Sequence, residues 1–470
     1  MITLSARALA SRLQEWRSSD PAYRALADRI RLLVLDGVVA PGTRLPAERE
    51  LAAELGVSRT TIAAAYADLR DDGSIESVRG SGSVVRSSNR PMQIPDLATG
   101  PIDFSKATMP VYPGLAAAIR AATEQLPAML AESGFDPLGR DEVRAAIAQR
   151  YTDRGLPTTP DQIMVTVGAQ HAITLIARTV LRRGDRVLIE NPTYPHAMDS
   201  ILAAGGRLVP VPVDAAEGWD ENALAQVIER GSPALAYLMP DNHNPTGATM
   251  PTPLLERSLA LAAAHGTVVV VDETMGELTI DGPRRLPAAA YGPAVLLGSV
   301  GKSLWGGLRL GWVRADPSFI RTLTRARFAS DLGTPAFEQT VVAGMLPDFD
   351  RVLDERVAWL RAGREHVLAE LARRFPEWRV PVPGGGLTAW AGLGRPVSSQ
   401  LVLAARSAGL VITPGPRFAA DGAFERFLRI PFSHPVEFTD RALDVLERVW
   451  ARVAGGAVRA AEVDDFAAVI

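Results

Sequence analysis

The chain has 470 residues, of which 47% are hydrophobic and 22% charged, and its formal net charge is −3. This composition is typical of a globular protein with two or three domains and excludes a disordered or fibrous chain. With no cysteine and six scattered histidines, the sequence predicts neither disulfides nor a metal site. It also lacks an apolar run of membrane-spanning length and the apolar block of a signal peptide, so we expect no membrane partner and a cytoplasmic location.

Residues 1–85 carry the pattern of a winged helix-turn-helix. Apolar residues at helical spacing predict a helix in "YRALADRIRLLVLDGVV", and a stretch rich in Pro and Gly interrupts the chain after it. Two short helices follow, because "AERELAAEL" ends at Gly56 and Ser58 can cap the N-terminus of "RTTIAAAYADLRDDG". Two β-prone runs between residues 75 and 85, joined by a Gly-Ser turn, predict the hairpin that forms the wing.

Residues 44–85 resemble the DNA-binding domain of GntR-family regulators, with both helices, the turn and the wing in the same order. In this fold the start of the second helix enters the major groove of double-stranded DNA. We therefore expect contacts with promoter DNA from the helix before the turn, the start of the second helix and the wing tip. These residues are Arg49, then Arg59, Thr60 and Thr61, and finally Arg79 and Gly80. The alternative is a solvated face of arginines, which leaves the order of the motif unexplained.

Residues 86–102, "RSSNRPMQIPDLATGPI", predict a linker, because Pro and Ser interrupt them and no periodicity is present. Beyond them, short Val/Ile/Leu runs alternate with helical segments, which predicts an α/β fold with a mostly parallel sheet. We expect a large domain over 103–330 and a smaller α+β domain over 331–470. Since ligands of such sheets bind at the carboxyl ends of the strands, the residues directly after each run are candidates for a site.

Lysine is rare in this chain, with only Lys106 and Lys302 among 50 basic residues. A lysine amine can lose its proton and attack a carbonyl, whereas an arginine guanidinium cannot. Nothing around Lys106 indicates chemistry, but Lys302 follows the apolar run "LLGSV", and residues with suitable side chains or backbone amides also follow the other runs. These residues are Gly168, Ala169 and Gln170 after "MVTV", Tyr194 after "LIE", Asn244 after "AYLMP", Asp272 after "VVVV", and Ser299 and Arg309 on either side of Lys302.

One ligand, pyridoxal 5′-phosphate, has a group for each of these residues. Its aldehyde would condense with Lys302, its ring nitrogen would pair with Asp272, and its phenolic oxygen would accept a hydrogen bond from Asn244. Its ring would lie against Tyr194. Its phosphate would bind the backbone amides of 168–170 at a helix N-terminus, together with Ser299 and Arg309.

The motifs "NPTG", Asp272 and "SVGKSLWGGLRLGW" resemble those of fold-type I aminotransferases, over roughly Ile102 to the C-terminus. Asn244 and Asp272 are 28 residues apart, and Asp272 and Lys302 are 30 apart. The segments "VPGGGLTAW" and "PGPRFAADGAFERFLRIPFSHP" resemble the small domain of that family, which implies that Arg429 binds the carboxylate of a substrate or effector.

A GntR-like domain ahead of an aminotransferase-like domain resembles the MocR group of bacterial transcription regulators. That resemblance implies a head-to-tail homodimer whose DNA binding changes with pyridoxal phosphate or with an amine that reacts with it. The effector and the target genes remain open, as does the choice between activation and repression. A binding protein that neither reads DNA nor catalyses would leave the helix-turn-helix unexplained.

A working aminotransferase with an accessory DNA-binding domain is the main alternative. Members of that family place a tyrosine two or three residues after the aspartate, where this chain has Thr274 and Met275. Gly134 and Phe135 stand where relatives often supply a phenol to the phosphate bound by the neighbouring subunit. Neither change prevents Lys302 from reacting with an aldehyde. Both favour a regulator in which sustained turnover is absent or slow.

Overall fold

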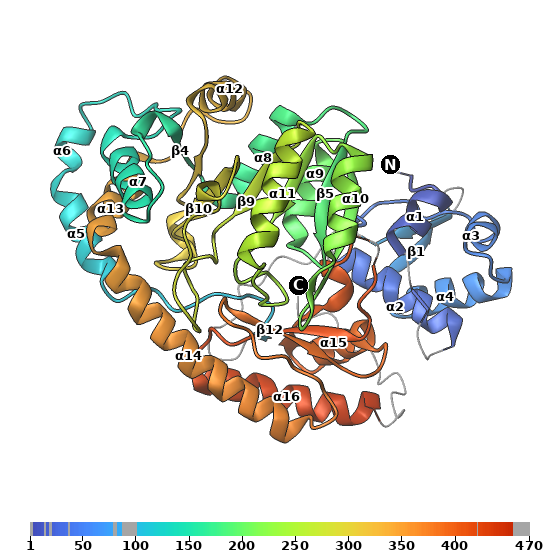
Figure 1. Ribbon diagram of the computed structural model, residues 1–470. Coiled ribbons are helices and arrows are strands. Elements are labelled where there is room, and N and C mark those ends of the chain that lie inside the picture. Colours follow the sequence, from blue (N-terminus) through green and yellow to red (C-terminus); the bar gives the residue numbers. More distant parts are fainter. Residues whose placement is uncertain are drawn as a thin grey trace.

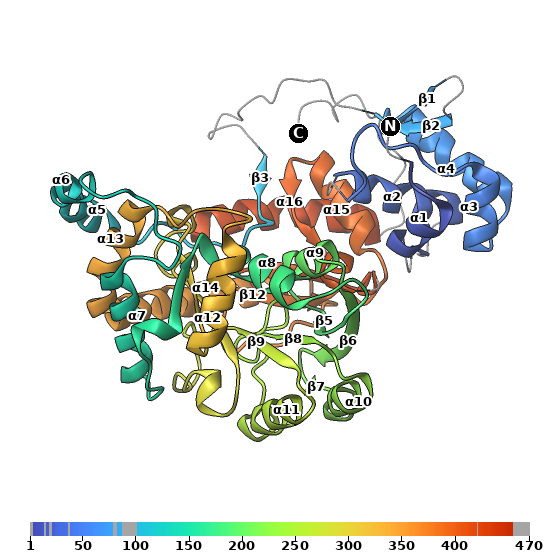
Figure 2. The same cartoon turned by 90° about the horizontal axis from the view of Figure 1, so that it is seen from above.

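The computed structural model describes residues 3–13, 16–17, 21–35, 38–78, 82–86, 101–420 and 422–454. A small helical domain lies at one end of a larger α/β body (Figures 1 and 2). The predicted fold class is confirmed, because a winged helix precedes a mostly parallel sheet and a smaller α+β part. Most of the predicted linker, residues 87–100, lies outside the described residues, and the domain boundaries stay predictions.

The described residues of the N-terminal domain form four helices and a hairpin. They are α1 (Ala6–Leu13), α2 (Ala22–Leu35), α3 (Glu48–Leu55), α4 (Arg59–Asp71), β1 (Ile75–Val78) and β2 (Gly82–Val85). The turn between α3 and α4 forms as expected, because Gly56 has a left-handed φ of 63° and Ser58 Oγ accepts a hydrogen bond from Thr61 N at 3.1 Å. Leu26, Ile30 and Ile62 are fully buried in its apolar core.

An eight-stranded sheet forms the centre of the larger body, in the order β4-β11-β10-β9-β8-β5-β6-β7. Neighbouring strands from β10 to β6 are parallel, while β11 and β7 run antiparallel to their neighbours. The strands are β4 (Ile163–Thr166), β5 (Arg186–Asn191), β6 (Arg207–Asp214), β7 (Gly218–Trp219), β8 (Leu235–Leu238), β9 (Val268–Asp272), β10 (Val295–Ser299) and β11 (Gly311–Arg314).

Helices cover both faces of this sheet, and alternate residues of each strand pack against opposite layers. Val187 and Ile189 join the apolar cluster that contains residues of α8 and α9, whereas Leu188 between them joins the other cluster. The helices of this part are α5 (Leu115–Glu124), α6 (Leu126–Met129), α7 (Asp141–Asp153), α8 (Gly168–Val180), α9 (Pro195–Ala203), α10 (Glu221–Gly231), α11 (Thr252–Ala264), α12 (Pro317–Arg327) and α13 (Ala336–Met345).

The C-terminal part has a three-stranded antiparallel sheet in the order β12-β15-β14. A separate pair joins β13 to β3, a strand that directly follows the predicted linker. These strands are β3 (Ile102–Asp103), β12 (Thr388–Gly392), β13 (Leu410–Val411), β14 (Thr413–Pro414) and β15 (Phe427–Pro431). The long helix α14 (Phe349–Arg374) runs along the edge of both parts, and α15 (Ser398–Ser407) and α16 (Val436–Ala454) complete the layer (Figure 1).

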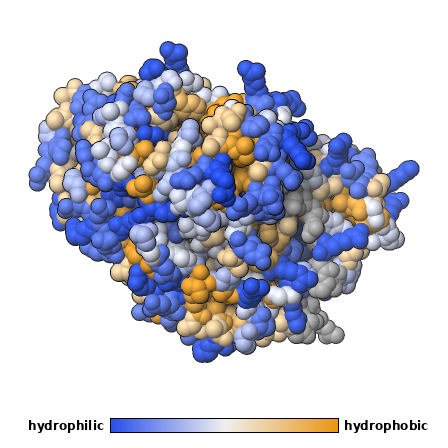
Figure 3. All heavy atoms as spheres, viewed as in Figure 1, coloured by the Kyte–Doolittle hydropathy of each residue, from blue (hydrophilic) through white to orange (hydrophobic). Residues whose placement is uncertain are grey.

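The N-terminal domain packs against the C-terminal part through α2 and α15, which lie side by side (Figures 1 and 2). Leu32 of α2 is 1% exposed and joins the apolar core of the larger body. The face of the molecule in Figure 3 is mostly hydrophilic, with apolar patches between the polar side chains. In the described ranges, no helix has both the length and the apolar character of a membrane span, and no acidic and histidine side chains group as metal ligands would.

Candidate functional site

Residues that follow separate strands come together at one edge of the central sheet. Asp272 is the last residue of β9 and Ser299 the last of β10, and Lys302 lies three residues beyond Ser299. Lys302 interacts electrostatically with both Asp272 and Arg429, although Arg429 comes from the C-terminal part. Lys302, Asp272 and Arg429 therefore lie together where the two parts of the body meet.

Lys302 is a partly buried amine that donates a hydrogen bond from Nζ to the carbonyl oxygen of Ala107, 2.8 Å away. Burial and the neighbouring Arg429 lower the pKa of Lys302 from 10.5 to about 8, while the carboxylate of Asp272 opposes the shift. A larger fraction of the side chain is therefore the neutral amine at neutral pH, which is the form that attacks a carbonyl.

Two donors orient the buried carboxylate of Asp272. Tyr237 Oη donates to its Oδ2 at 2.7 Å, and the backbone amide of Thr274 donates to its Oδ1 at 2.9 Å. Burial raises the pKa of Tyr237 well above its ordinary value, so this phenol keeps its proton and acts as a donor. Tyr237 was not predicted from the sequence, because only the pairing of β8 with β9 brings the two residues together.

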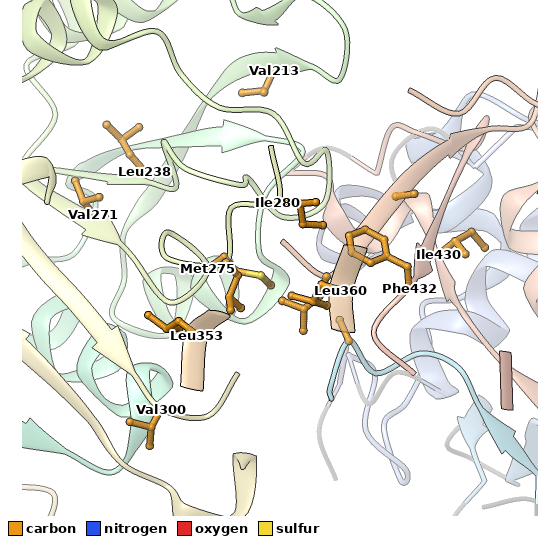
Figure 4. Packing of buried hydrophobic residues seen from close by; sticks show 14 of the residues in the cluster. Val213, Leu238, Val271, Met275, Ile280, Val300, Leu353, Leu360, Ile430 and Phe432 are labelled. Atoms are coloured by element: carbon orange, nitrogen blue, oxygen red, sulfur yellow. The ribbon is translucent and has the colours of Figure 1, made fainter. Parts of the chain in front are cut away.

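The two residues that replace the expected tyrosine point to different surroundings. Met275 is 7% exposed and packs in the apolar core with residues such as Ile280 and Leu360 (Figure 4). Thr274 lines a polar pocket that also includes Glu273, whose pKa burial raises to about 7. Neither side chain is a phenol, and the phenol that contacts Asp272 comes from Tyr237 instead.

A close approach of backbone and guanidinium marks the predicted phosphate site. Gly168, at the start of α8, has a φ of 79°, and a Cβ there would lie 2.9 Å from Nη2 of Arg309. Arg309 donates from Nη2 to the carbonyl oxygen of Val167 at 3.2 Å. Ser299 Oγ accepts from the amide of Gly301 and donates to the carbonyl of Leu310. The arrangement brings a cation, a hydroxyl and the N-terminus of α8 together, which suits an anion.

Residues 169 and 170 lie in the first turn of α8, where the sequence predicts that their backbone amides bind a phosphate. Ala169 continues the first turn of α8 after Gly168. The side chain of Gln170 points instead to α9, where its Nε2 donates to Ser200 Oγ at 2.8 Å and to the carbonyl of His196 at 3.1 Å. The side chain of Gln170 is therefore engaged with α9, and only the backbone amides of this turn remain as candidates to bind the phosphate.

Some buried polar atoms, among them atoms of predicted site residues, have no hydrogen-bond partner among the described residues. They include Oδ1 of Asn244, Oγ1 of Thr193 and Nε of Arg429. Buried polar groups are paired in most proteins, so these orphaned atoms are candidates for contacts with a polar ligand. Next to Thr193, burial and the nearby Asp272 raise the pKa of Tyr194 to about 12, which keeps this aromatic ring neutral.

Arg429 lies on β15, where it pairs with Trp390 of β12 and Thr413 of β14. Its guanidinium stacks over the ring of Phe418, 4.9 Å from the ring centre, and donates from Nη2 to the carbonyl of Ser105. Burial lowers the pKa of Arg429 to about 10, so it stays cationic at neutral pH. A buried cation beside an amine and a carboxylate is suited to bind the carboxylate of an amino compound.

Most of the predicted DNA contacts lie on the surface of the N-terminal domain. Arg59 has a side chain that is 74% exposed, with Nε 3.6 Å from a carboxylate oxygen of Glu48. Arg49 on α3 and Thr60 on α4 are also exposed. Thr61 is half-buried and takes part in capping α4. Arg79 and Gly80 at the wing tip lie outside the described residues.

Comparison with known proteins decides the family. The sequence model described as aminotransferase class I and II matches residues 96–446. The chain belongs to this aminotransferase family. A second model, described as bacterial regulatory proteins of the gntR family, matches residues 22–85 of this chain. The predicted combination of the two domains is confirmed.

Individual relatives include both enzymes and regulators. The structure of the α-aminoadipate aminotransferase LysN from Thermus thermophilus, complexed with N-(5′-phosphopyridoxyl)-L-leucine, has a TM-score of 0.69 and 29% identity, and the match covers 76% of this chain and 94% of LysN. The uncharacterized HTH-type transcriptional regulator YisV of Bacillus subtilis is 26% identical over 90% of this chain and 95% of its own. The probable rhizopine catabolism regulatory protein MocR of Rhizobium meliloti is 29% identical over 76% of this chain and 78% of its own.

The class I and II aminotransferases depend on pyridoxal phosphate, and the residues of this chain fit that cofactor. The amine of Lys302, with its lowered pKa, suits the aldehyde, and the carboxylate of Asp272 suits the ring nitrogen. The unpaired Oδ1 atom marks Asn244 as a partner for the phenolic oxygen, and Arg309 beside Gly168 suits the phosphate.

Proposed function

We propose that the chain is a transcription regulator that binds promoter DNA through its winged helix and senses pyridoxal phosphate, or an amine that reacts with it, in the aminotransferase-like domain. One observation carries this proposal: a helix-turn-helix with an exposed Arg59 is packed, through α2 and α15, on the body that holds Lys302 and Arg429. YisV and MocR, both named as regulatory proteins, are similar over most of this chain. Such a protein would act in the cytoplasm.

In this proposal each residue of the cluster has one task. Bound pyridoxal phosphate supplies an aldehyde that reacts with amines and a ring that withdraws electrons. Lys302 provides the nucleophilic amine, and Asp272, held by Tyr237, accepts a hydrogen bond from the protonated ring nitrogen. Asn244 faces the phenolic oxygen and Tyr194 the ring. The backbone of Gly168, Ala169 and Gln170, with Ser299 and Arg309, binds the phosphate.

Recognition of DNA and of the effector rests on arginines of two different kinds. Arg429 is buried and would bind an effector carboxylate through its guanidinium. Arg49, Arg59, Thr60 and Thr61 would meet base edges and phosphates in the major groove, and Arg79 with Gly80 would contact DNA from the wing. Because the ion pair that Arg59 forms with Glu48 is exposed, Arg59 can exchange that partner for DNA at small cost.

A working aminotransferase is the second candidate, and the low pKa of Lys302 together with the likeness to LysN favours it. Met275, however, lies in the apolar core at a position where family members carry a tyrosine. We therefore propose that amines react at the site, while sustained turnover with a keto acid is absent or slow.

We also propose a head-to-tail homodimer, as the resemblance to the MocR group implies. Leu130 and Phe135 support it, because these large apolar side chains are 81% and 69% exposed in the single chain. A second copy would remove them from water. Light scattering of the purified protein should give twice the mass of one chain, and Phe135→Ser should lower that mass.

The experiment that tests the proposed function combines two measurements on the full-length protein. Protein loaded with pyridoxal phosphate should absorb visible light, and borohydride reduction should fix the cofactor on Lys302. Lys106→Ala is the matched control, because Lys106 is the other lysine, 70% exposed and paired with Asp103 at 2.8 Å. The same protein should bind the DNA upstream of its own gene more tightly than random DNA. A colourless protein, or equal binding to both DNAs, would contradict the proposal.

A further inference from the structure

A short segment, residues 103–108, contacts both cations of the site, and we name it the strap. Lys302 donates from Nζ to the carbonyl oxygen of Ala107 at 2.8 Å, and Arg429 donates from Nη2 to the carbonyl oxygen of Ser105. The two acceptors are two residues apart in the chain. The strap thus contacts Lys302, which the proposed function pairs with the cofactor aldehyde, and Arg429, which it pairs with the effector carboxylate.

The strap is also held by backbone hydrogen bonds, by two aromatic contacts and by two side-chain hydrogen bonds. His434 Nε2 bonds to the carbonyl oxygen of Lys106 at 2.7 Å, and Thr413 Oγ1 donates to the carbonyl oxygen of Ser105 at 3.4 Å. In and next to the two-residue strand β3, the amides of Ile102 and Phe104 donate to the carbonyls of Gly409 and Val411, both at 2.8 Å. The buried ring of Phe104 packs against those of His434 and Phe438. Because β3 pairs, among the described strands, only with the equally short β13, the strap depends on its contacts with the site more than a long central strand would.

The strap also lies at the point where the body joins the DNA-binding domain. Residues 87–102 separate the strap from Arg86, the residue after the wing strand β2, and 87–100 of them are outside the described part of the chain. On its other side, β13 packs against α15, and α15 packs against α2 of the winged helix. A displacement of the strap therefore acts on the segment that tethers the DNA-binding domain.

A ligand carboxylate that binds Arg429 through Nη2 would compete with the Ser105 carbonyl, which accepts from the same nitrogen. Both acceptors meet a charged donor, but a carboxylate also brings a negative charge and can accept two parallel hydrogen bonds from a guanidinium, so it is the stronger partner for Arg429. We infer that an amino compound with an α-carboxylate releases the strap from Arg429 and that this release, through the adjoining linker, changes promoter affinity. This inference rests on the proposed function, which it deepens by naming the segment that transmits ligand binding.

Two probes that differ by one group test the release of the strap. One is N-(5′-phosphopyridoxyl)-L-leucine, and the other is the same compound without its carboxylate, N-(5′-phosphopyridoxyl)-3-methylbutylamine. Both are bound to cofactor-free, full-length protein, and hydrogen exchange of the peptide containing residues 101–108 is followed by mass spectrometry. The carboxylate compound should bind about tenfold to a hundredfold more tightly and should accelerate exchange of the Ile102 and Phe104 amides. The other compound should leave that exchange unchanged.

Promoter affinity, measured by fluorescence anisotropy, tests the transmission. We expect the two complexes to differ in affinity by about fivefold or more, the usual range of allosteric coupling. A variant with six Gly and Ser residues inserted between positions 90 and 91 should keep the faster exchange and lose the difference in affinity, because the longer linker no longer follows the strap. A difference that survives the insertion would overturn transmission through the linker.

Failure of the inference and failure of the proposed function give different results. If the carboxylate compound binds no more tightly than its partner, or binds without faster exchange of residues 101–108, the inference is wrong. Visible absorbance with pyridoxal phosphate and specific promoter binding would still support the proposed function. If pyridoxal phosphate does not bind, or promoter DNA is bound no better than random DNA, the proposed function fails and the inference fails with it.

Discussion

The lowered pKa of Lys302 gives a prediction that can be tested on a single residue. With a pKa of about 8, roughly 9% of its amine is neutral at pH 7, against about 0.03% at the ordinary value of 10.5, which is a difference of about 300-fold. Burial is the main cause and Arg429 contributes, whereas Asp272 acts in the opposite direction. Arg429→Gln should therefore raise the pKa of Lys302, and Asp272→Asn should lower it.

Competitive acylation measures this pKa directly, because the chain contains only one other lysine. Cofactor-free protein is labelled with a trace of acetic anhydride across a series of pH values, and the labelling of Lys302 is quantified by mass spectrometry relative to the exposed Lys106. We expect labelling of Lys302 to rise with a midpoint near pH 8, and this midpoint should move in opposite directions in the two variants. A midpoint near 10.5, or a shift of both variants in the same direction, would refute the assignment of burial and charge as the causes.

Three further predictions address the proposed contacts and the chemistry. Arg59→Ala should weaken promoter binding by about 1–3 kcal/mol if the side chain contacts a base. Arg207 is an exposed arginine on β6, and Arg207→Ala should leave promoter binding unchanged. Equal losses in the two variants would refute the role of α4. Gly168→Ala should lower pyridoxal phosphate affinity because its Cβ would lie 2.9 Å from Arg309, while Gly266→Ala, which has a similar φ and open surroundings, should strain the backbone without that loss. Steady-state assays with pairs of amino acids and keto acids should detect turnover well below about 1 s⁻¹, and faster turnover would favour the enzyme.

Much of the fold could be predicted because the signals are local. The turn between α3 and α4 depends on Gly56 and Ser58, whose conformational and capping preferences act within a few residues. Apolar runs separated by helical segments predicted the parallel sheet, and the positions of Asp272 and Lys302 at strand ends followed from the rule that such sheets bind ligands at their carboxyl edge.

The parts of the site that were not predicted depend on contacts between distant segments. Tyr237 reaches Asp272 only because β8 and β9 are neighbours in the sheet, and its burial in an apolar strand gives no sequence signal of that contact. The contact of Arg429 with Ser105 joins residues 324 positions apart. Likewise, the sequence shows that Met275 supplies no phenol. It does not show that Met275 packs in the apolar core with residues of α14.

The central claim is that one chain couples a pyridoxal phosphate site to DNA recognition. The most direct test is the affinity of the full-length protein for the DNA upstream of its gene, measured with and without pyridoxal phosphate, in the wild type and in Lys302→Ala. We predict specific binding whose affinity changes by about fivefold or more with the cofactor in the wild type, and a smaller change in the variant. Equal affinity for upstream and random DNA, or an affinity that ignores the cofactor and every added amine while turnover reaches about 1 s⁻¹, would contradict the claim.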